Sequence, residues 1–442
     1  MQSPERVNKI ALVMWLLGLL SYAMAVINRS SFAALGPIAQ DHFGVEAAVL
    51  GSFAVMQLIL YVSMQIPVGI LVHRFGPTVV IVTGGLLMAL GQALLAVAGD
   101  IWVVVLARVL VGIGDALTFV SVLRLQAHWF PVRQLPIWTQ VTSQLGMAGQ
   151  VVSVLPLALL VTTAGWATGF LSVAGATLLL SLASIVLLKD SPLRKSLFVR
   201  VMSAGRRSRR TTDTGTIRTG SVFSDMAAQF RQLPQLLRIP GVRLAFWVHF
   251  TTPFSAGVTL MLWGYPFLTG GVGLDRSTAS SLLILTVLAS VIIGLMLGPI
   301  SARFYTFRVQ LVVGSIVLIA LSWLAVLLWP GTPPLWLLIE LMIAVALGSP
   351  MSMISFDIAR AFTPPRQISL ATGFVNTGGF ISLIFTLFAV GIGLDLLDAG
   401  SPETYNLPDF RLAMAAQFAC WIIGLAFILR ESGLAKATQA IS

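Results

Sequence analysis

Residues 10–36 read IALVMWLLGLLSYAMAVINRSSFAALG, a stretch in which one charged side chain, Arg29, interrupts a long apolar run. A bilayer core about 30 Å thick is spanned by roughly 20 predominantly apolar residues in a helix. This stretch is long enough to cross it. The chain contains twelve such stretches, at residues 10–36, 47–71, 77–98, 102–128, 137–162, 166–188, 243–268, 278–301, 309–329, 335–358, 368–394 and 410–430.

The composition excludes an ordinary water-soluble protein. Of the 442 residues, 57% are hydrophobic and only 10% are charged, and the mean hydropathy is +0.93. A soluble domain needs far more charge to cover its surface. We therefore predict an all-α membrane protein with twelve transmembrane helices. No phosphate-binding loop or zinc-protease motif is present, so the sequence favours neither an ATP-driven pump nor an enzyme, and it implies no metal or other cofactor.

The basic residues predict the orientation in the membrane. The net charge is +11, which in a soluble protein would suggest nucleic-acid binding. With the N-terminus in the cytoplasm, however, 22 of the 27 Lys and Arg residues fall on the cytoplasmic side. This is the positive-inside pattern. It indicates a multi-pass protein of the cytoplasmic (inner) membrane with both termini in the cytoplasm, and it argues against a nucleic-acid partner.

One long polar stretch divides the chain. The sequence predicts an N-terminal six-helix bundle at 1–190, a basic cytoplasmic linker at 191–240 and a C-terminal six-helix bundle at 241–442. The basic cluster at 194–210 is typical either of a solvated loop that fixes topology or of a segment that binds anionic lipid headgroups. Residues 223–237 could form an amphipathic helix on the membrane surface.

The two halves repeat each other weakly. A glycine precedes an arginine by five positions between spans 2 and 3 (Gly69, Arg74) and again between spans 8 and 9 (Gly298, Arg303). Weak internal symmetry of this kind is typical of transporters built from two like halves. It predicts two pseudo-symmetric bundles around a site near the middle of the membrane.

The same residues resemble the major facilitator superfamily over nearly the whole chain. Gly69, Arg74 and Gly76 fit the family's loop motif, although His73 stands at its aspartate position. The segment from Arg108 to Gly114 resembles the Arg-x-x-x-Gly-x-Gly motif of the family's fourth helix. The resemblance implies the major facilitator fold and transport by alternating access.

Two shorter stretches are similar to anion-carrying branches of that family. Residues 22–37 resemble the first helix of the organophosphate:phosphate antiporters, in which a first-helix arginine binds the substrate, and Arg29 would be its match. That branch has a second arginine in helix 7, and the apolar body of span 7 here has none. The glycine-rich run 373–379 resembles nitrate-type carriers, whose arginines in helices 2 and 8 are absent here.

Charged and polar side chains inside the spans are the candidate site residues, because a charge at the bilayer centre costs about 2.5–3.5 kcal/mol and is kept for a function or a partner. Guanidinium groups suit carboxylate, phosphate or nitrate, and amides can orient a substrate. The predicted substrate-binding residues are Arg29, Asn28, Arg108, Gln144, Asn376 and Trp263. The alternative for Arg29 is a structural ion pair. Trp263 could equally belong to an interfacial aromatic belt.

Three titratable residues are candidates for proton coupling: Asp115, Glu340 and His249. Asp115 lies seven residues after Arg108 on one face of span 4, about 10 Å along the axis, so a direct pair between them is not expected. Glu340 occupies a comparable place in span 10. His249 could instead be a packed, hydrogen-bonded histidine.

Four charged residues near the predicted cytoplasmic ends suggest an inner gate: Arg74, Arg124, Arg303 and Asp357. In one interpretation Asp357 pairs with Arg124 across the repeat. In the other it pairs with Arg360, three residues further along its own helix.

We therefore expect a monomeric secondary transporter for a small solute, with an organic or inorganic anion favoured because Arg29 and Arg108 make the cavity positive. Proton coupling would come from the carboxylates. The alternatives are an exporter of amphipathic compounds with the same fold, which would have a more apolar cavity, and a transporter-like membrane receptor that binds a ligand without moving it.

Overall fold

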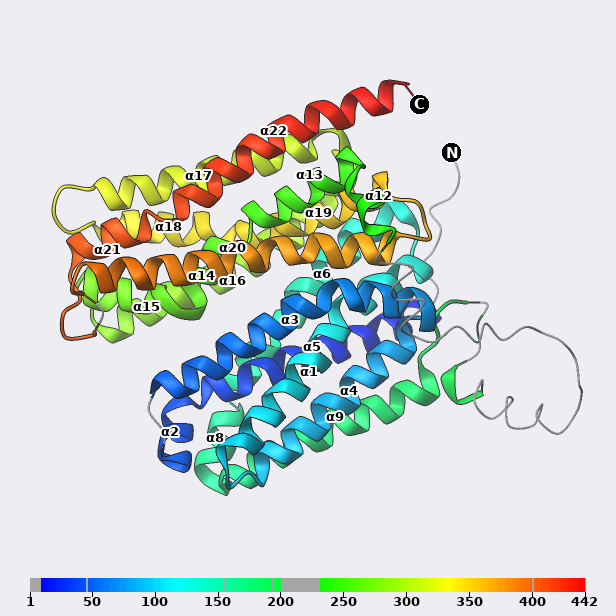
Figure 1. Ribbon diagram of the computed structural model, residues 1–442, viewed down its shortest axis with the longest axis horizontal. Helices are drawn as coiled ribbons and strands as arrows, with labels where there is room; N and C mark the ends of the chain where they lie inside the picture. The colour runs from blue at the N-terminus through cyan, green and yellow to red at the C-terminus, as the bar shows by residue number, and fades with distance from the viewer. Residues whose placement is uncertain are drawn as a thin grey trace, which may run out of the picture. The chain divides into compact units, whose positions relative to one another are not determined.

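The computed structural model describes residues 9–44, 47–154, 156–192, 194, 196–199, 231–399 and 401–441 (Figure 1). Within these residues every regular element is a helix. Eleven stretches of helix are long and apolar enough to cross a membrane. The all-α membrane fold predicted from the sequence is thus confirmed.

The chain groups into two compact units. The first comprises Met1–Leu135 and Leu145–Gln235, and the second comprises Pro136–Gln144 and Leu236–Ser442. Helix α6 (Leu135–Met147) is therefore divided between them. Most of the predicted linker, 191–240, lies outside the described residues. Its basic cluster is described only at 194 and 196–199, and its predicted amphipathic helix only from residue 231.

Long helices build the first unit. Besides the end of α6, its elements are α1 (Lys9–Ala34), α2 (Gly36–Phe43), α3 (Ala47–Phe75), α4 (Pro77–Ala96), α5 (Ile101–Trp129), the short helix η1 (Val132–Gln134), α7 (Gly149–Val154), α8 (Pro156–Ala164) and α9 (Trp166–Leu187).

Close packing of α4 against α5 forms the centre of the first unit. A Cβ on Gly84 would lie 2.7 Å from the carbonyl oxygen of Gly114, and a Cβ on Gly114 would lie 2.5 Å from that of Gly84. Only glycine allows two backbones to approach this closely. The glycines that follow Arg108 on α5 therefore serve helix packing, and they fix the depth at which Arg108 and Asp115 lie.

A buried carboxylate caps the start of α4. The Thr78 amide donates to Asp190 Oδ1 at 2.9 Å, and Asp190 is 1% exposed. Gly76 immediately precedes α4 with φ +87°, and a Cβ there would lie 2.7 Å from Asp190 Oδ2. The negative charge that favours this helix N-terminus therefore comes from Asp190, just after the end of α9. At the aspartate position of the loop motif this chain has His73.

The second unit has more interruptions. Its helices include α12 (Leu233–Leu237), α13 (Pro240–Thr251), α14 (Phe254–Val258), α15 (Gly264–Pro266), α16 (Arg276–Arg303), α17 (Arg308–Leu328), α18 (Leu335–Ala346), α19 (Gly348–Phe362), α20 (Ile368–Leu396), α21 (Leu407–Met414) and α22 (Gln417–Ile441). Two π-helical turns, η2 (Thr259–Trp263) and η3 (Phe267–Gly271), and the 3₁₀ turn η4 (Tyr305–Phe307) complete it.

The seventh predicted span, 243–268, is present but broken into α13, α14, η2, α15 and η3. Proline has no amide proton and clashes with the preceding turn, and Pro253 lies in the gap between α13 and α14. Further along, a Cβ on Gly264 would lie 2.1 Å from the Thr259 carbonyl, so glycine permits the π-turn there. This explains why the seventh predicted span is the one that is missing from the eleven long apolar helical stretches.

Helix α13 is central in the second unit, where it packs against α19, α20 and α22. At its start, Arg243 pairs with the buried Glu431 of α22 at 2.7 Å and also donates to the Leu237 carbonyl at 2.9 Å. At the start of α16, hydrogen bonds from Ser277 and Thr278 hold the pKa of Asp275 well below its usual range.

The Gly76–Asp190 contact predicts a stability difference among glycine variants. Gly76→Ala should lower the free energy of unfolding by about 1–3 kcal/mol for backbone strain and by about 1 kcal/mol more for the displaced cap. Gly165 is the matched control, because its φ is +89° and nothing lies within 4 Å of its would-be Cβ.

Thermal unfolding in detergent measures both effects. We expect Gly76→Ala to have the lower midpoint, Gly165→Ala an intermediate one, and Gly175→Ala, in open space on α9, one close to the unmodified protein. Equal midpoints for the first two would show that the Asp190 cap contributes nothing.

Candidate substrate and coupling site

An ion pair in the interior of the first unit is the core of the candidate site. Arg29 Nη1 of α1 lies 3.2 Å from Asp115 Oδ2 of α5. The Asp115 side chain is 2% exposed, whereas the Arg29 side chain is 23% exposed. The Arg29 side chain thus keeps some accessible surface, while the side chain of its carboxylate partner has almost none. Such an arginine is able to accept a second anionic partner.

Two tyrosines flank this pair. The Arg29 guanidinium lies over the Tyr61 ring, 5.8 Å from its centroid. Tyr22 packs against Phe119 with ring centroids 4.9 Å apart. A Cβ on Gly146 would lie 2.0 Å from the Tyr22 ring, so the glycine is what admits this ring beside the pair.

The sequence predicts that Arg108 and Asn28 bind the substrate, but both side chains are buried. Arg108 is 1% exposed, lies 4.8 Å above the Phe32 ring and donates to Gln92 Oε1 at 3.4 Å. Asn28 is fully buried and donates to Thr177 Oγ1 at 3.0 Å. Neither side chain is accessible as Arg29 is. Their role as direct substrate ligands stays a prediction.

Among the described residues, three buried polar atoms of this cluster have no hydrogen-bond partner: Arg108 Nε, Arg108 Nη1 and Asn28 Oδ1. Arg108 forms no ion pair there, and its neighbour Gln92 is neutral. A buried cation without a counterion makes the surroundings electropositive, which favours an anion on the α1 side of the unit.

The second unit contributes a neutral polar cluster. His249 of α13 is buried, and its Nδ1 lies 3.0 Å from Ser355 Oγ and 3.2 Å from the Ser352 carbonyl oxygen of α19. Its side chain also interacts with Asn376 of α20, which is 3% exposed. The two predicted residues His249 and Asn376 are therefore brought together. His249 is thus a packed, hydrogen-bonded histidine, which is one of the two alternatives that the sequence left open.

Gln144, at the second unit's end of α6, is 2% exposed and packs against Gly294 of α16. A Cβ on Gly294 would lie 2.5 Å from Gln144 Cγ, so the glycine makes room for the amide. Gln144 Nε2 has no hydrogen-bond partner among the described residues. The role of Gln144 in orienting a substrate stays a prediction.

Glu340 and Trp263 lie apart from the buried cluster. Glu340 of α18 is half-buried and accepts a hydrogen bond from Ser322 Oγ of α17 at 2.7 Å. Trp263 is half-buried and donates from Nε1 to the Leu387 carbonyl at 3.0 Å. Each has a local hydrogen-bond partner. Proton coupling through Glu340 and substrate contact through Trp263 stay predictions.

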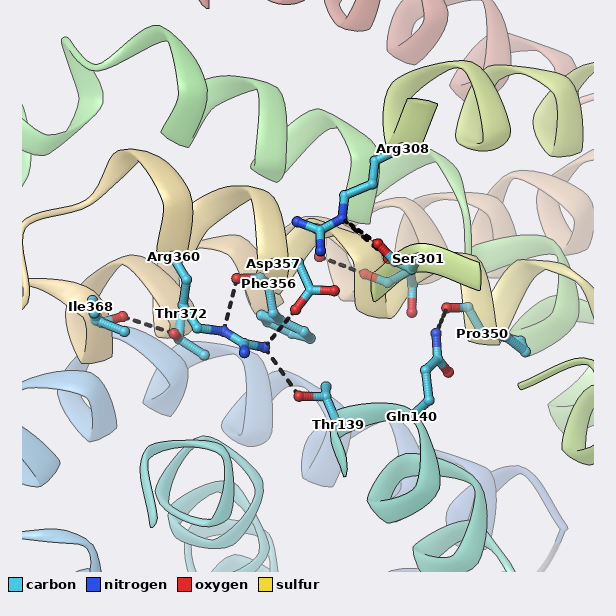
Figure 2. A network of polar contacts seen from close by, with 12 residues as sticks. Thr139, Gln140, Ser301, Arg308, Pro350, Phe356, Asp357, Arg360, Ile368 and Thr372 are labelled. Carbon is cyan, nitrogen blue, oxygen red and sulfur yellow. Dashed lines mark hydrogen bonds and ion pairs between the residues drawn. The ribbon is translucent and has the colours of Figure 1, made fainter. Parts of the chain in front are cut away.

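A polar network in the second unit contains Asp357 (Figure 2). Arg360 Nη2 lies 3.0 Å from Asp357 Oδ1 and donates to Thr139 Oγ1 of α6 at 3.1 Å. Arg308 Nε donates to the Ser301 carbonyl at 3.1 Å on the opposite side of Asp357. Asp357 therefore forms the ion pair along its own helix that the sequence offered as one of two alternatives.

Two of the other predicted gate residues lie over neighbouring aromatic rings. Arg74 lies over the Phe75 ring at 5.2 Å and Arg303 over the Phe304 ring at 5.6 Å. Arg124 is half-buried and makes no hydrogen bond or ion pair with any part of the chain that the structure describes. Their action as a gate stays a prediction.

The sequence did not point to two buried polar residues, Gln92 and Asp190, because their partners on α1 and α4 lie far away in the chain. Gln140 Nε2, which donates to the Pro350 carbonyl at 2.6 Å, is another (Figure 2). Among the described residues no group of three His, Cys, Asp or Glu side chains could hold a metal ion.

A sequence model of the Major Facilitator Superfamily matches residues 18–387. The chain belongs to the major facilitator superfamily. Its resemblance to that family in the loop and fourth-helix motifs is thus confirmed, and the protein is a multi-pass membrane transporter that works by alternating access.

Solved transporters share the fold of this superfamily member. The crystal structure of the E. coli fucose:proton symporter FucP matches with a TM-score of 0.67 at 18% identity, over 95% of this chain and 99% of that chain. FucP in its outward conformation matches with a TM-score of 0.66 at 16% identity over the same shares. At these identities the likeness shows the fold alone.

Two curated transporters are similar in sequence. The probable sulfoacetate transporter SauU of Cupriavidus necator is 26% identical over 173 residues, which is 39% of this chain and 40% of that protein. The uncharacterized transporter YybO of Bacillus subtilis is 28% identical over 174 residues, with the same shares. The matched segments span about two-fifths of the length of each relative.

The Asp357–Arg360 pair predicts a distinct pattern of rescue in this transporter. Removing one partner of a buried ion pair costs about 3–5 kcal/mol, because the other charge is left uncompensated. Asp357→Asn and Arg360→Gln should each lower the thermal midpoint in detergent. The double variant should be more stable than either single variant.

Arg124→Gln is the control that separates the two interpretations. Combined with Asp357→Asn, it should give no recovery of stability or uptake. Recovery with Arg124→Gln, but not with Arg360→Gln, would identify Arg124 as the working partner of Asp357.

Proposed function

We propose that this protein is a secondary transporter of a small organic anion, of the carboxylate or sulfonate class, coupled to protons. Arg29 is the group that binds the anion, and Asp115 is the carboxylate that carries the proton. The observation that supports this is the 3.2 Å ion pair in which the arginine side chain is partly exposed and the aspartate side chain is not.

The chemistry follows from competition for one guanidinium. Asp115 neutralises Arg29 when no substrate is bound, which stabilises an otherwise unpaired charge in a low-dielectric interior. A substrate anion must share or replace that partner. Two carboxylates beside one guanidinium leave an excess negative charge, so binding is favoured when Asp115 takes up a proton. The anion and the proton then bind together.

This coupling is thermodynamically reciprocal. If protonation of Asp115 raises the affinity for the anion, the bound anion raises the affinity for the proton by the same factor. When the anion leaves on the other side, Asp115 returns to Arg29 and releases its proton. Alternating access of the two units then moves both species in one direction.

The substrate class is supported by chemistry and by similarity. The bidentate guanidinium fork matches the planar carboxylate and the oxygens of a sulfonate. SauU, which is similar over two-fifths of its length, is described as a probable transporter of sulfoacetate, a small molecule with both groups. The proposed placement has both chain termini in the cytoplasm and the transporter acting as a monomer in the inner membrane.

Arg29→Gln tests the anion site. In proteoliposomes with labelled sulfoacetate, and with a panel of small carboxylates as competitors, we expect the variant to lose at least about 100-fold in affinity, the loss of roughly 3 kcal/mol of a charge-assisted pair. Arg276→Gln, at the exposed start of α16, is the matched control and should bind normally.

The alternatives have their own outcomes in the same assay. Unchanged affinity in Arg29→Gln with transport of apolar amphipathic compounds would support the exporter. Binding without flux by the unmodified protein would support the receptor.

Asp115→Asn tests the proton coupling. The amide cannot be protonated, so the apparent affinity for the anion should no longer fall as pH rises, whereas the unmodified protein should lose up to about tenfold per pH unit. Uptake driven by a proton gradient should vanish while anion exchange persists.

A protonophore provides the second measurement for Asp115. It should abolish accumulation by the unmodified protein and leave exchange by Asp115→Asn unaffected. A pH-dependent, protonophore-sensitive Asp115→Asn would move the proton site to another residue, with Glu340 the next to test.

A further inference from the structure

We propose that Gln92 is the positioning residue that aims Arg29, and hence a determinant of anion affinity in this transporter. The inference rests on the proposed function of Arg29 and extends it to α4. Among the described residues, Gln92 forms no hydrogen bond with Arg29 or Asp115; its partners are Asn28, Ser31 and Arg108.

The amide of Gln92 binds α1 on both sides of Arg29. Gln92 is 0% exposed, and its Nε2 donates to the Asn28 carbonyl at 3.1 Å and to Ser31 Oγ at 3.0 Å. The Ser31 hydroxyl itself donates to the same Asn28 carbonyl at 3.0 Å. One side chain of α4 thus fixes the backbone before Arg29 and the side chain after it.

Other bonds hold the same turn of α1 from different directions. Asn28 Nδ2 donates to Thr177 Oγ1 of α9 at 3.0 Å. Ser30 Oγ lies 2.9 Å from Ser153 Oγ of α7, and Ser153 donates to the Ile27 carbonyl at 3.2 Å. Every polar neighbour of Arg29 is therefore bound to a surrounding helix. Arg29 is the one polar side chain of this turn left to face Asp115 and the substrate.

Gln92 differs from these other anchors because it also contacts a charge. Its Oε1 accepts from Arg108 Nη2 at 3.4 Å. The Nε2 donor of the amide therefore binds α1, and its Oε1 acceptor binds the buried Arg108 guanidinium. Only a group with both a donor and an acceptor can form both sets of bonds. A carboxylate at this position would satisfy Arg108 but would face the Asn28 carbonyl with lone pairs.

A charge-neutral variant separates a positioning role from simple partnership with Arg108. Ligand-binding side chains need their supporting hydrogen bonds to stay within a fraction of an ångström of the productive geometry. Gln92→Leu removes both contacts, Gln92→Glu keeps only the one to Arg108, and Ser31→Ala removes an acceptor on α1 while leaving the bond to Arg108 and adding no charge. If Gln92 aims Arg29, all three variants weaken anion binding. If it merely partners Arg108, Ser31→Ala binds as well as the unmodified protein.

The experiment uses purified full-length protein with two independent readouts. Sulfoacetate uptake in proteoliposomes gives KM and kcat, and we expect Gln92→Leu and Gln92→Glu to raise KM at least about tenfold while kcat changes less. Gln417→Leu is the matched control: Gln417 is 0% exposed and accepts from Ser255 Oγ at 2.7 Å in the second unit. It should keep its KM.

The second readout does not depend on any substrate. The infrared carboxylate band that is lost in Asp115→Asn reports the titration of Asp115, whose ionisable neighbours are Arg29 and the phenols of Tyr22 and Tyr61. A displaced Arg29 should move the midpoint of that titration by about half a pH unit or more in both Gln92 variants, and by nothing in Gln417→Leu.

The two readouts keep the failures distinguishable. No sulfoacetate transport by the unmodified protein, with a shifted Asp115 titration in the Gln92 variants, overturns the proposed substrate and keeps the positioning role. An unshifted titration overturns the positioning role. If Gln92→Leu does not fold, Ser31→Ala, which deletes one acceptor of Gln92 without changing a charge, must still shift the midpoint and raise KM, or the inference is wrong.

Discussion

Opposite charges buried together in an apolar interior depend on each other, and the Arg29–Asp115 pair is where this constraint shapes the protein. Removing either partner of such a pair costs about 3–5 kcal/mol, because the other charge is left uncompensated. The same cost makes the pair responsive. Anything that neutralises Asp115 leaves Arg29 in need of another anion, and the surrounding helices are arranged so that only the arginine is reachable, at 23% exposure against 2%.

Much of the fold was predictable because the bilayer fixes the length and polarity of each span. Predicted and observed boundaries agree within a few residues for α4, α5 and α9, whose ends carry Gly76, Asp100 and Gly165 as turn or cap residues. The seventh span shows the limit. The sequence predicts one continuous span there, but Pro253 and Gly264 break it into short helices and π-turns.

The candidate site was predictable as a set of residues and not as a set of contacts. The scarcity of charge in the spans identified Arg29, Arg108, Asp115 and Asp357 directly. Spacing along α5 excluded an Arg108–Asp115 pair, yet no local pattern could reveal that Asp115 pairs with Arg29, 86 positions earlier. Gln92 was missed for the same reason: an amide in an apolar run carries no local signal, and its meaning comes from Asn28 and Ser31 on another helix.

The two units share an architecture but differ in their chemistry. The first concentrates ionised groups, Arg29, Asp115 and Arg108, in a hydrogen-bonded frame on α1, α4 and α5. The second has a buried hydrogen-bonded cluster of His249, Ser355 and Asn376, and its Asp357–Arg360 ion pair lies near the end of α19 (Figure 2). A buried charge is costly without a partner, whereas hydroxyl and amide groups can satisfy one another by hydrogen bonds. Under the proposed function, the selectivity for a charged group therefore comes from the first unit.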